Sequence, residues 1–331
     1  MYLVGIDIGG TKCAVVLGKT GDDRDFLEKE PVVIDKVKFP TEGTPYDVIE
    51  RFCFETEAML ERNNLENNDI ACIGINCGGP VDSRNGMILS PPNLLGWDEI
   101  PIVDIFEKRF GIRSKLQNDA NAGALAEWLY GAGKGYRNVM FITFGTGFGA
   151  GLILDGRLYS GTNDMAGEVG HVRLADNGPV GFGKAGSCEG FCSGGGIVQI
   201  ARTKVLEKLQ MGGKVSFCKS IDDLDGLTAK IVGDAAEAGD ELGLEIYKIS
   251  GEYLGKALSI FIDILNPEII AIGSIFARST DILWPHAKEV IERETLVHSR
   301  KVCKVVPAAL GEKIGDLEAL SIAAYEMAKE L

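Results

Sequence analysis

The sequence lacks any segment that would direct it into or across a membrane. It has no basic stretch followed by apolar residues and no run of about twenty apolar residues. It also lacks grouped Lys and Arg, which a nucleic-acid surface needs to displace counterions from phosphates; the net charge of −14 is spread along the chain. We therefore expect a cytoplasmic protein with neither a membrane nor a nucleic acid as partner.

Paired cysteine motifs are absent as well. The eight cysteines include no Cys-x-x-Cys pair, which argues against a zinc ribbon or a thioredoxin-type centre. Most of them lie inside apolar runs, so we interpret them as buried thiols. Cys188 and Cys192 alone are close in sequence, and a single four-residue spacing is weak support for a metal site.

No low-complexity tract or Ser-rich linker divides the chain, although 331 residues exceed the roughly 150 of an average domain. Apolar residues make up 45% and charged residues 25%, as in ordinary folded proteins. We therefore expect two folded parts with separate cores.

The chain does contain a strand, glycine turn and strand that occurs twice, at 2–17 and again at 138–156. Glycine lets a backbone approach an anion closely, and Thr11 and Thr146 add hydroxyl donors, so both turns are candidate phosphate loops. Each turn taken alone is more often only a turn. A strand follows the second turn where a Rossmann fold would have a helix, which disfavours that fold.

Further helices and strands alternate along the chain. Thr44, Pro45 and Asp47 form a helix-start signal, and Gly131 and Asn266-Pro267 are helix-stop signals. This alternation predicts an α/β fold with mixed sheets. The expected helices and strands are a helix from 45, a strand at 70–76, helices at 102–111, 120–131 and up to 264, strands at 268–274 and 304–310, and a helix at 316–331.

Asn118 and Asp119 lie where a strand runs into a helix. A carboxylate in the first helical turn is stabilised by the helix dipole and free N–H groups, so capping is the simple interpretation. The alternative is a general base that accepts a proton from an attacking hydroxyl.

Glu168, His171 and Glu189 lie in a glycine-rich stretch between 156 and 196. Carboxylates and imidazoles fix the direction of hydrogen bonds to a hydroxyl-rich ligand. A metal ligand or a plain polar loop residue are the other interpretations of His171.

Seven motifs follow one another along the chain: DIGGTK, PPNLLGW, NDANAGALAE, FGTGFGAGLILDG, AGEVGH, the stretch from Glu189 to Gly194, and NPEIIAIGS. With these motifs in this order, the chain resembles the ROK family of sugar kinases and related repressors, within the actin, hexokinase and Hsp70 superfamily. The resemblance implies a two-lobed actin-like, ribonuclease H-like fold that uses ATP and Mg²⁺, and a homodimer.

The resemblance also implies a role for each matching residue. Asp119 matches the catalytic base, and Asp7 matches the carboxylate that holds Mg²⁺ through water. Sugar ligands are implied at Asn118, Glu168, His171 and Glu189, with Gly79 and Asn93 as weaker candidates; nucleotide contacts are implied at Gly9, Gly10, Thr11, Lys12, Gly145, Thr146, Gly147 and Gly273.

Residues 1–118 with the helix 317–331 are expected to form the N-terminal lobe, and residues 119–316 the C-terminal lobe. The family's regulators carry a DNA-binding module before the first phosphate loop. Here the strand that leads into this loop begins at Tyr2. We therefore expect an active kinase, with glucose at its 6-hydroxyl as the leading substrate. The alternatives are N-acetylmannosamine, mannose or fructose as substrate, or a catalytically silent sugar-binding or regulatory protein.

The chain departs from zinc-binding members of the family. Val180, Phe182 and Ser187 stand where the resemblance places three cysteines, which leaves His171 without partner ligands. We expect no structural zinc, and packing of Val180 and Phe182 into a small apolar cluster in its place.

Overall fold

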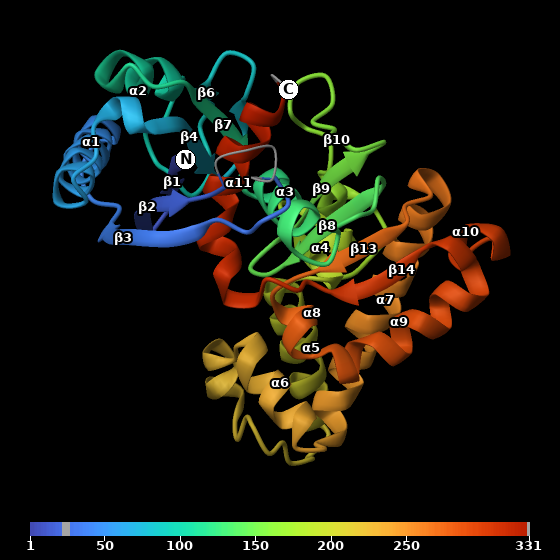
Figure 1. Ribbon diagram of the computed structural model, residues 1–331. Helices are drawn as coiled ribbons and strands as arrows, with labels where there is room; N and C mark the ends of the chain where they lie inside the picture. The colour runs from blue at the N-terminus through green and yellow to red at the C-terminus, as the bar shows by residue number, and fades with distance from the viewer. Residues whose placement is uncertain (22–26, 330–331) are drawn as a thin grey trace. The chain divides into compact units, whose positions relative to one another are not determined.

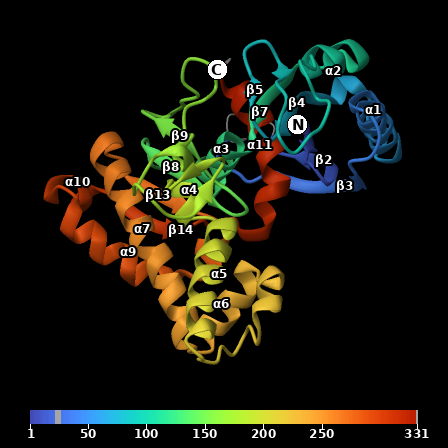
Figure 2. The same ribbon diagram turned by 180° about the vertical axis from the view of Figure 1, so that it is seen from behind.

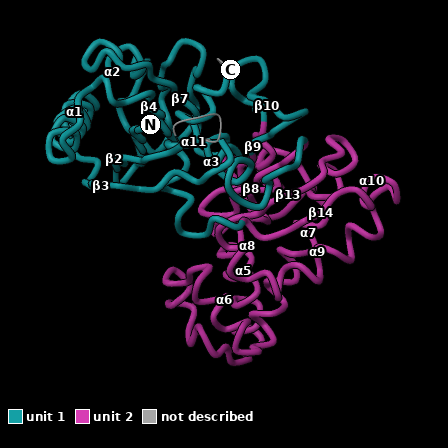
Figure 3. The backbone as a smooth tube through the Cα atoms, in the orientation of Figure 1, with its two compact units in different colours: residues 1–137, 151–166, 309–331 teal, residues 138–150, 167–308 magenta. Residues whose placement is uncertain are grey.

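The computed structural model describes residues 1–21 and 27–329, so the ends of the expected helix 316–331 and C-terminal segment 317–331 lie outside the described residues. The chain divides into two compact units (Figure 3). Unit 1 comprises Met1–Arg137, Gly151–Ala166 and Ala309–Leu331, and unit 2 comprises Asn138–Ala150 and Gly167–Ala308.

A five-stranded mixed sheet in the order β3-β2-β1-β4-β7 forms the centre of unit 1 (Figure 1). The central strand β1 runs antiparallel to β2 and parallel to β4, which places Asp7 beside Asn76. The strands are β1 (Tyr2–Ile8), β2 (Lys12–Lys19), β3 (Val32–Pro40), β4 (Ile70–Cys77) and β7 (Ser114–Asn118).

Helices cover both faces of this sheet because side chains alternate along each strand. Val4 and Ile6 point into the larger core, to which α1 (Pro45–Arg62) and α2 (Ile102–Phe110) contribute. Leu3 points to the other face and packs with residues of α11 (Ile314–Ala328). Figures 1 and 2 show this helix beside the strands of unit 1.

The approach of α11 to the sheet depends on glycine. A Cβ atom on Gly74 would lie 1.9 Å from the carbonyl oxygen of Ala319, and one on Gly18 would lie 2.7 Å from the Leu320 side chain. Without side chains at these strand positions, the helix backbone lies directly on the sheet. Glu318 is thereby brought close to the ends of β1 and β4.

Helix α3 (Asp119–Tyr130) packs on α11 and belongs to unit 1. Its Glu127 is fully buried, and the carboxylate accepts hydrogen bonds from the backbone N–H groups of Ala132, Ala309 and Leu310 at 2.7, 3.1 and 2.9 Å. These contacts tie α3 to the segment that leads into α11. The two units therefore do not divide after residue 118, where the sequence analysis placed the boundary.

The second five-stranded sheet has the order β10-β9-β8-β13-β14, and unit 2 contributes β8, β13, β14 and the start of β9 to it, together with a set of helices. Long helix α7 packs closely on α9, since a Cβ on Gly255 would lie 2.6 Å from the Ala287 carbonyl oxygen. The strands are β8 (Val139–Phe144), β9 (Phe148–Leu154), β10 (Arg157–Leu158), β13 (Ile269–Ile272) and β14 (Lys304–Pro307). The helices of unit 2 are α4 (Cys188–Phe191), α5 (Gly194–Gln210), α6 (Ala229–Glu237), α7 (Glu241–Leu265), α8 (Ile275–Arg278), α9 (Thr280–Glu294) and α10 (Val297–Val302).

Short elements complete the described chain. They are the hairpins β5 (Val81–Asp82) with β6 (Met87–Ile88) and β11 (Val180–Gly181) with β12 (Lys184–Ala185), and the 3-10 turns η2 (Asn67–Asp69), η3 (Val169–His171), η4 (Ile221–Gly226) and η5 (Gly311–Lys313).

Most expected helices and strands are confirmed. The Thr44 hydroxyl accepts from the Asp47 N–H at 3.3 Å, and the Asp47 carboxylate accepts from the Thr44 N–H at 2.8 Å, which is a complete capping box. The interpretation of the cysteines also holds: seven are buried, Cys303 is half-buried, and all eight are free thiols. Across residues 1–21 and 27–329, no helix has the length and apolar character needed to span a bilayer.

Candidate active site

Two carboxylates and an amide meet at the ends of β1 and β4 in unit 1. The Asn76 amide nitrogen donates to Asp7 Oδ1 at 3.1 Å and to Glu318 Oε2 at 3.2 Å. Asn76 itself is 3% exposed, and its Oδ1 atom has no hydrogen-bond partner. Asp7 was selected from the sequence, whereas Asn76 and Glu318 were not.

The surroundings of this cluster make both carboxyl groups hold a proton to a higher pH than usual. Burial raises the pKa of Asp7 from 3.8 to about 6, and the charge of Asp119 adds to the shift, while the hydrogen bond from Asn76 opposes it. Burial also raises the pKa of Glu318 well above its ordinary value, with further contributions from Asp7 and Asp119. A cation beside Asp7 would reverse this preference, so the donor set fits Mg²⁺, which prefers carboxylate and water oxygens.

Asn118 and Asp119 begin helix α3. Asn118 is the cap, because its Oδ1 accepts from the Asn121 N–H at 2.8 Å. The Asp119 carboxylate accepts from the Ala120 N–H at 2.8 Å, and its side chain remains accessible to solvent. Protein nevertheless surrounds it closely enough that desolvation raises the pKa of Asp119. A carboxylate with this environment is a better proton acceptor than an ordinary surface aspartate.

The first candidate phosphate loop, between β1 and β2, is held from two sides. On one side Thr41 donates through its hydroxyl to the Gly9 carbonyl at 2.6 Å and through its N–H to the Thr11 carbonyl at 3.1 Å. On the other side a Cβ on Gly10 would lie 2.6 Å from the Asn93 carbonyl oxygen. Because the Gly9 and Thr11 carbonyls accept hydrogen bonds from Thr41, they point toward Thr41. The groups of the loop that can bind an anion are its N–H groups.

The second candidate loop, between β8 and β9, contacts one of the predicted sugar ligands. Glu189 accepts a hydrogen bond from the Phe148 N–H at 3.2 Å, and a Cβ on Gly147 would lie 2.9 Å from the same carboxylate. The Gly145 carbonyl accepts from the Gly194 N–H at 2.8 Å, at the start of α5. Glu189, which belongs to the glycine-rich stretch 156–196, is therefore held against the loop between β8 and β9.

A cavity of about 490 Å³ opens in unit 2 next to this loop. A Cβ on Gly194 would contact both Ile275 and Ala229, which line the cavity together with Tyr247 and Arg278. Its volume falls within the range of roughly 300–1,000 Å³ that is usual for small-molecule sites. The sequence analysis identified only the turn at Gly273, whose N–H donates to the Ile142 carbonyl at 2.9 Å.

Glu168 and His171 lie at the two ends of η3 in unit 2, both exposed. The His171 ring contacts the Phe182 ring edge to face, with centroids 5.3 Å apart. The expected apolar cluster is wrong, because Val180 and Phe182 are 47% and 70% exposed. The hairpin β11–β12 is too short to bury them, and its backbone packs through Gly181 instead.

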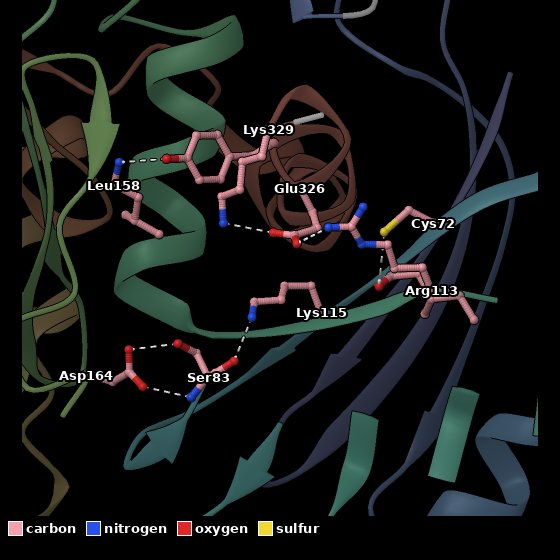
Figure 4. Close-up of polar contacts among 10 residues, drawn as sticks. Cys72, Ser83, Arg113, Lys115, Leu158, Asp164, Glu326 and Lys329 are labelled. Atoms are coloured by element: carbon pink, nitrogen blue, oxygen red, sulfur yellow. Dashed lines mark hydrogen bonds and ion pairs between the residues drawn. The ribbon is translucent and has the colours of Figure 1, made fainter. Parts of the chain in front are cut away.

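The segment before η3 is held by hydrogen bonds between Asp164 and Ser83, both of which belong to unit 1. Asp164 is buried, and its carboxylate accepts from the Ser83 N–H at 2.7 Å and from the Ser83 hydroxyl at 2.8 Å (Figure 4). Lys115 donates to the Ser83 carbonyl at 2.8 Å. This polar cluster fixes the start of the stretch that leads to Glu168.

The predicted site residues are divided between the two units. Gly79 leaves room for a side chain, since a Cβ there would come no closer than 3.9 Å to Asn118, so the fold does not require glycine at that position. Unit 1 holds Asp7, Gly9, Gly10, Thr11, Lys12, Gly79, Asn93, Asn118 and Asp119, and unit 2 holds Gly145, Thr146, Gly147, Glu168, His171, Glu189 and Gly273.

The described part of the chain contains no group of three or more His, Cys, Asp or Glu side chains arranged to hold a metal ion. Cys188 and Cys192 are both fully buried, and the Cys192 thiol donates to the Ser250 carbonyl at 3.8 Å. Ser187 caps α4 through its hydroxyl, which accepts from the Gly190 N–H at 3.1 Å.

Comparison with known proteins gives consistent matches. The glucokinase of Thermotoga maritima is 33% identical over 323 residues, which are 97% of each chain. Among solved structures, the ROK hexokinase from Thermus thermophilus has a TM-score of 0.78 at 25% identity, covering 99% of this chain and 100% of that one. A ROK family glucokinase from Streptomyces griseus, solved with glucose and AMPPNP, has a TM-score of 0.74 at 26% identity, covering 98% and 100%.

These neighbours confirm the α/β fold with mixed sheets and place it among the actin-like ATPase folds. The model of the ROK family matches residues 3–326, nearly the whole chain. The chain therefore belongs to the ROK family.

Proposed function

We propose that this protein transfers the γ-phosphoryl group of ATP to a hydroxyl of a free hexose, with the 6-hydroxyl of glucose as the leading acceptor. The observation that carries the proposal is Asp119: an accessible carboxylate at a helix start, with a pKa that its surroundings raise. Similarity to glucokinases over 97% of the chain supports the same activity.

In this reaction Asp119 accepts the proton of the sugar hydroxyl as that oxygen bonds to the γ-phosphorus and the bond to ADP breaks. The polar side chains that the sequence analysis selected orient this hydroxyl through hydrogen bonds. The proposed sugar ligands are Asn118, Glu168, His171 and Glu189, with Gly79 and Asn93 beside them.

The phosphates are assigned to the two glycine loops. Their N–H groups and the Thr11 and Thr146 hydroxyls are the donors for phosphate oxygens. The cavity lined by Ala229 and Ile275 has the size and position for the adenosine, close to the turn at Gly273. Further loop positions assigned to the nucleotide are Gly9, Gly10, Lys12, Gly145 and Gly147.

Asp7 would hold Mg²⁺ through water, and the bound ion would supply positive charge for the phosphates. Asn76 and Glu318 keep Asp7 in place through the shared amide. The proposed enzyme acts as a homodimer in the cytoplasm.

Substrate identity is tested by a coupled assay with ATP and Mg²⁺ against glucose, mannose, fructose and N-acetylmannosamine. We expect the highest kcat/KM for glucose, with glucose 6-phosphate as the product identified by NMR. A higher value for N-acetylmannosamine would reassign the substrate. Sugar binding by calorimetry without turnover of any sugar would instead support the silent sugar-binding protein.

A further inference from the structure

Phe182 has an unusual position for a phenylalanine. Its side chain is 70% exposed, and its backbone has a φ of 43°, in the left-handed region. Large apolar residues gain nothing from exposure, and residues other than glycine, asparagine and aspartate seldom adopt this conformation. The hairpin turn accounts for the conformation, since Phe182 and Gly183 are its two turn residues and both have a positive φ. The turn does not account for a large exposed aromatic ring at this position, and the ring therefore points to a role outside the fold.

The hairpin that carries Phe182 is fixed to the residues proposed to bind sugar. A Cβ on Gly181 would lie 2.8 Å from Glu189 Cβ, so the hairpin backbone packs directly on the start of α4. Lys184 donates through Nζ to the His171 carbonyl at 2.7 Å. All of these residues belong to unit 2.

The Phe182 ring itself lies beside His171. The two rings meet edge to face, with centroids 5.3 Å apart and planes at 78°. His171 is exposed as well, so an aromatic surface and an imidazole are presented to solvent side by side. The Arg173 side chain donates to the Ala185 carbonyl at 2.8 Å and closes the other end of the hairpin.

We propose that Phe182 is a platform for the substrate, whose ring packs against the C–H surface of the sugar while His171 binds a hydroxyl. This inference rests on the proposed function and names a further specificity-determining residue for it. Sugars carry C–H bonds with partial positive charge, and the face of an aromatic ring carries partial negative charge, so the two surfaces attract. The contact also removes apolar area from water.

If Phe182 is such a platform, substitutions at this position should change KM for the sugar and leave KM for ATP unchanged. We expect Phe182→Ala and Phe182→Gly to raise KM for the preferred sugar by about three- to tenfold, the scale of one aromatic contact. KM for ATP should stay within about twofold, because the ring has no part in phosphate binding. Phe182→Tyr should keep the wild-type KM for sugar, since the ring is retained.

Phe182→Gly separates this loss from misfolding. Glycine adopts a φ of 43° without strain, so this variant should unfold at a temperature no lower than wild type. Val180→Ala, on the same hairpin and 47% exposed, is the matched control and should leave KM for sugar unchanged.

The two possible failures are distinguishable. If wild type phosphorylates the preferred sugar normally and Phe182→Gly keeps the same KM, the platform is refuted and the proposed function stands. If wild type turns over no sugar in the panel, the proposed function fails and the platform fails with it. A rise in KM of equal size for glucose and N-acetylmannosamine would place the ring contact on the pyranose itself, whereas a rise confined to N-acetylmannosamine would place it on the acetyl methyl group.

Discussion

Asp7 and Glu318 accept hydrogen bonds from the same nitrogen atom, the side-chain amide of Asn76, at 3.1 and 3.2 Å. They lie 311 residues apart in the sequence, on a strand and a helix of unit 1. Both carry a raised pKa, so the folded protein binds protons here more tightly than the unfolded chain does.

This relationship predicts how stability depends on pH when divalent cations are absent. The pKa of Asp7 rises from 3.8 to about 6 on folding, so the folded state holds the extra proton between these values. The free energy of unfolding should therefore fall as pH increases from about 4 to about 6, and stay lower above that range. Urea unfolding in the presence of EDTA, repeated at a series of pH values, measures this free energy of unfolding.

Asp7→Asn should remove the part of this dependence that Asp7 carries, while the part from Glu318 remains. The free energy of unfolding of the variant minus that of wild type should therefore be higher at pH 8 than at pH 4 by on the order of 2 kcal/mol, after allowance for solvent screening. Asp104→Asn, an exposed carboxylate on α2, is the control and should show the wild-type curve. Identical pH curves for wild type and Asp7→Asn would contradict the assignment of the raised pKa to Asp7.

Asp119→Asn should lower kcat by at least about a hundredfold, the scale of a lost general base. The amide keeps the size of the carboxylate and its capacity to accept from the Ala120 N–H, so the helix start should survive. Kinetics give kcat, and calorimetry should show sugar binding close to wild type. Near-normal turnover would remove Asp119 from the role of base.

Thr41→Val should raise KM for ATP several-fold and leave KM for sugar unchanged. The substitution keeps the shape of the side chain but deletes the hydroxyl that donates to the Gly9 carbonyl at 2.6 Å. We expect a loss of about 1 kcal/mol in the free energy of unfolding, the usual contribution of one such bond. Thr41→Ser retains the hydroxyl and should recover both values; an equal defect in both variants would show that only packing matters.

The purified protein should contain far less than one zinc per chain after dialysis. Val180 and Phe182 have no donor atoms, the Ser187 hydroxyl caps α4, and Cys188 is fully buried. Elemental analysis measures the metal, and a zinc-selective chelator with Mg²⁺ in excess should leave activity and melting temperature unchanged. Stoichiometric zinc would mean that cysteines near α4 act as ligands.

Sequence patterns predicted the features that a few neighbouring residues determine. The glycine turns, the capping signal at Thr44 and the helix start at Asn118 each reside in a few consecutive residues. Glu318 was missed because its neighbours at Asn76 and Asp7 come from distant segments, although a charged residue inside the apolar pattern of α11 was a usable signal. The Phe182 conformation was missed for a different reason, since nothing in the sequence indicates a positive φ at a phenylalanine.

The close approach of α11 to Gly74 also has a consequence for synthesis on the ribosome. Strand β1 emerges at the start of translation, whereas α11 emerges roughly 300 residues later, which at ordinary elongation rates is on the order of 15–60 s. During that interval the sheet face with Leu3, Val16 and Cys72 has no helix to cover it. The nascent chain must therefore keep this apolar surface from aggregating until α11 covers it, although the core on the other face of the sheet can form earlier.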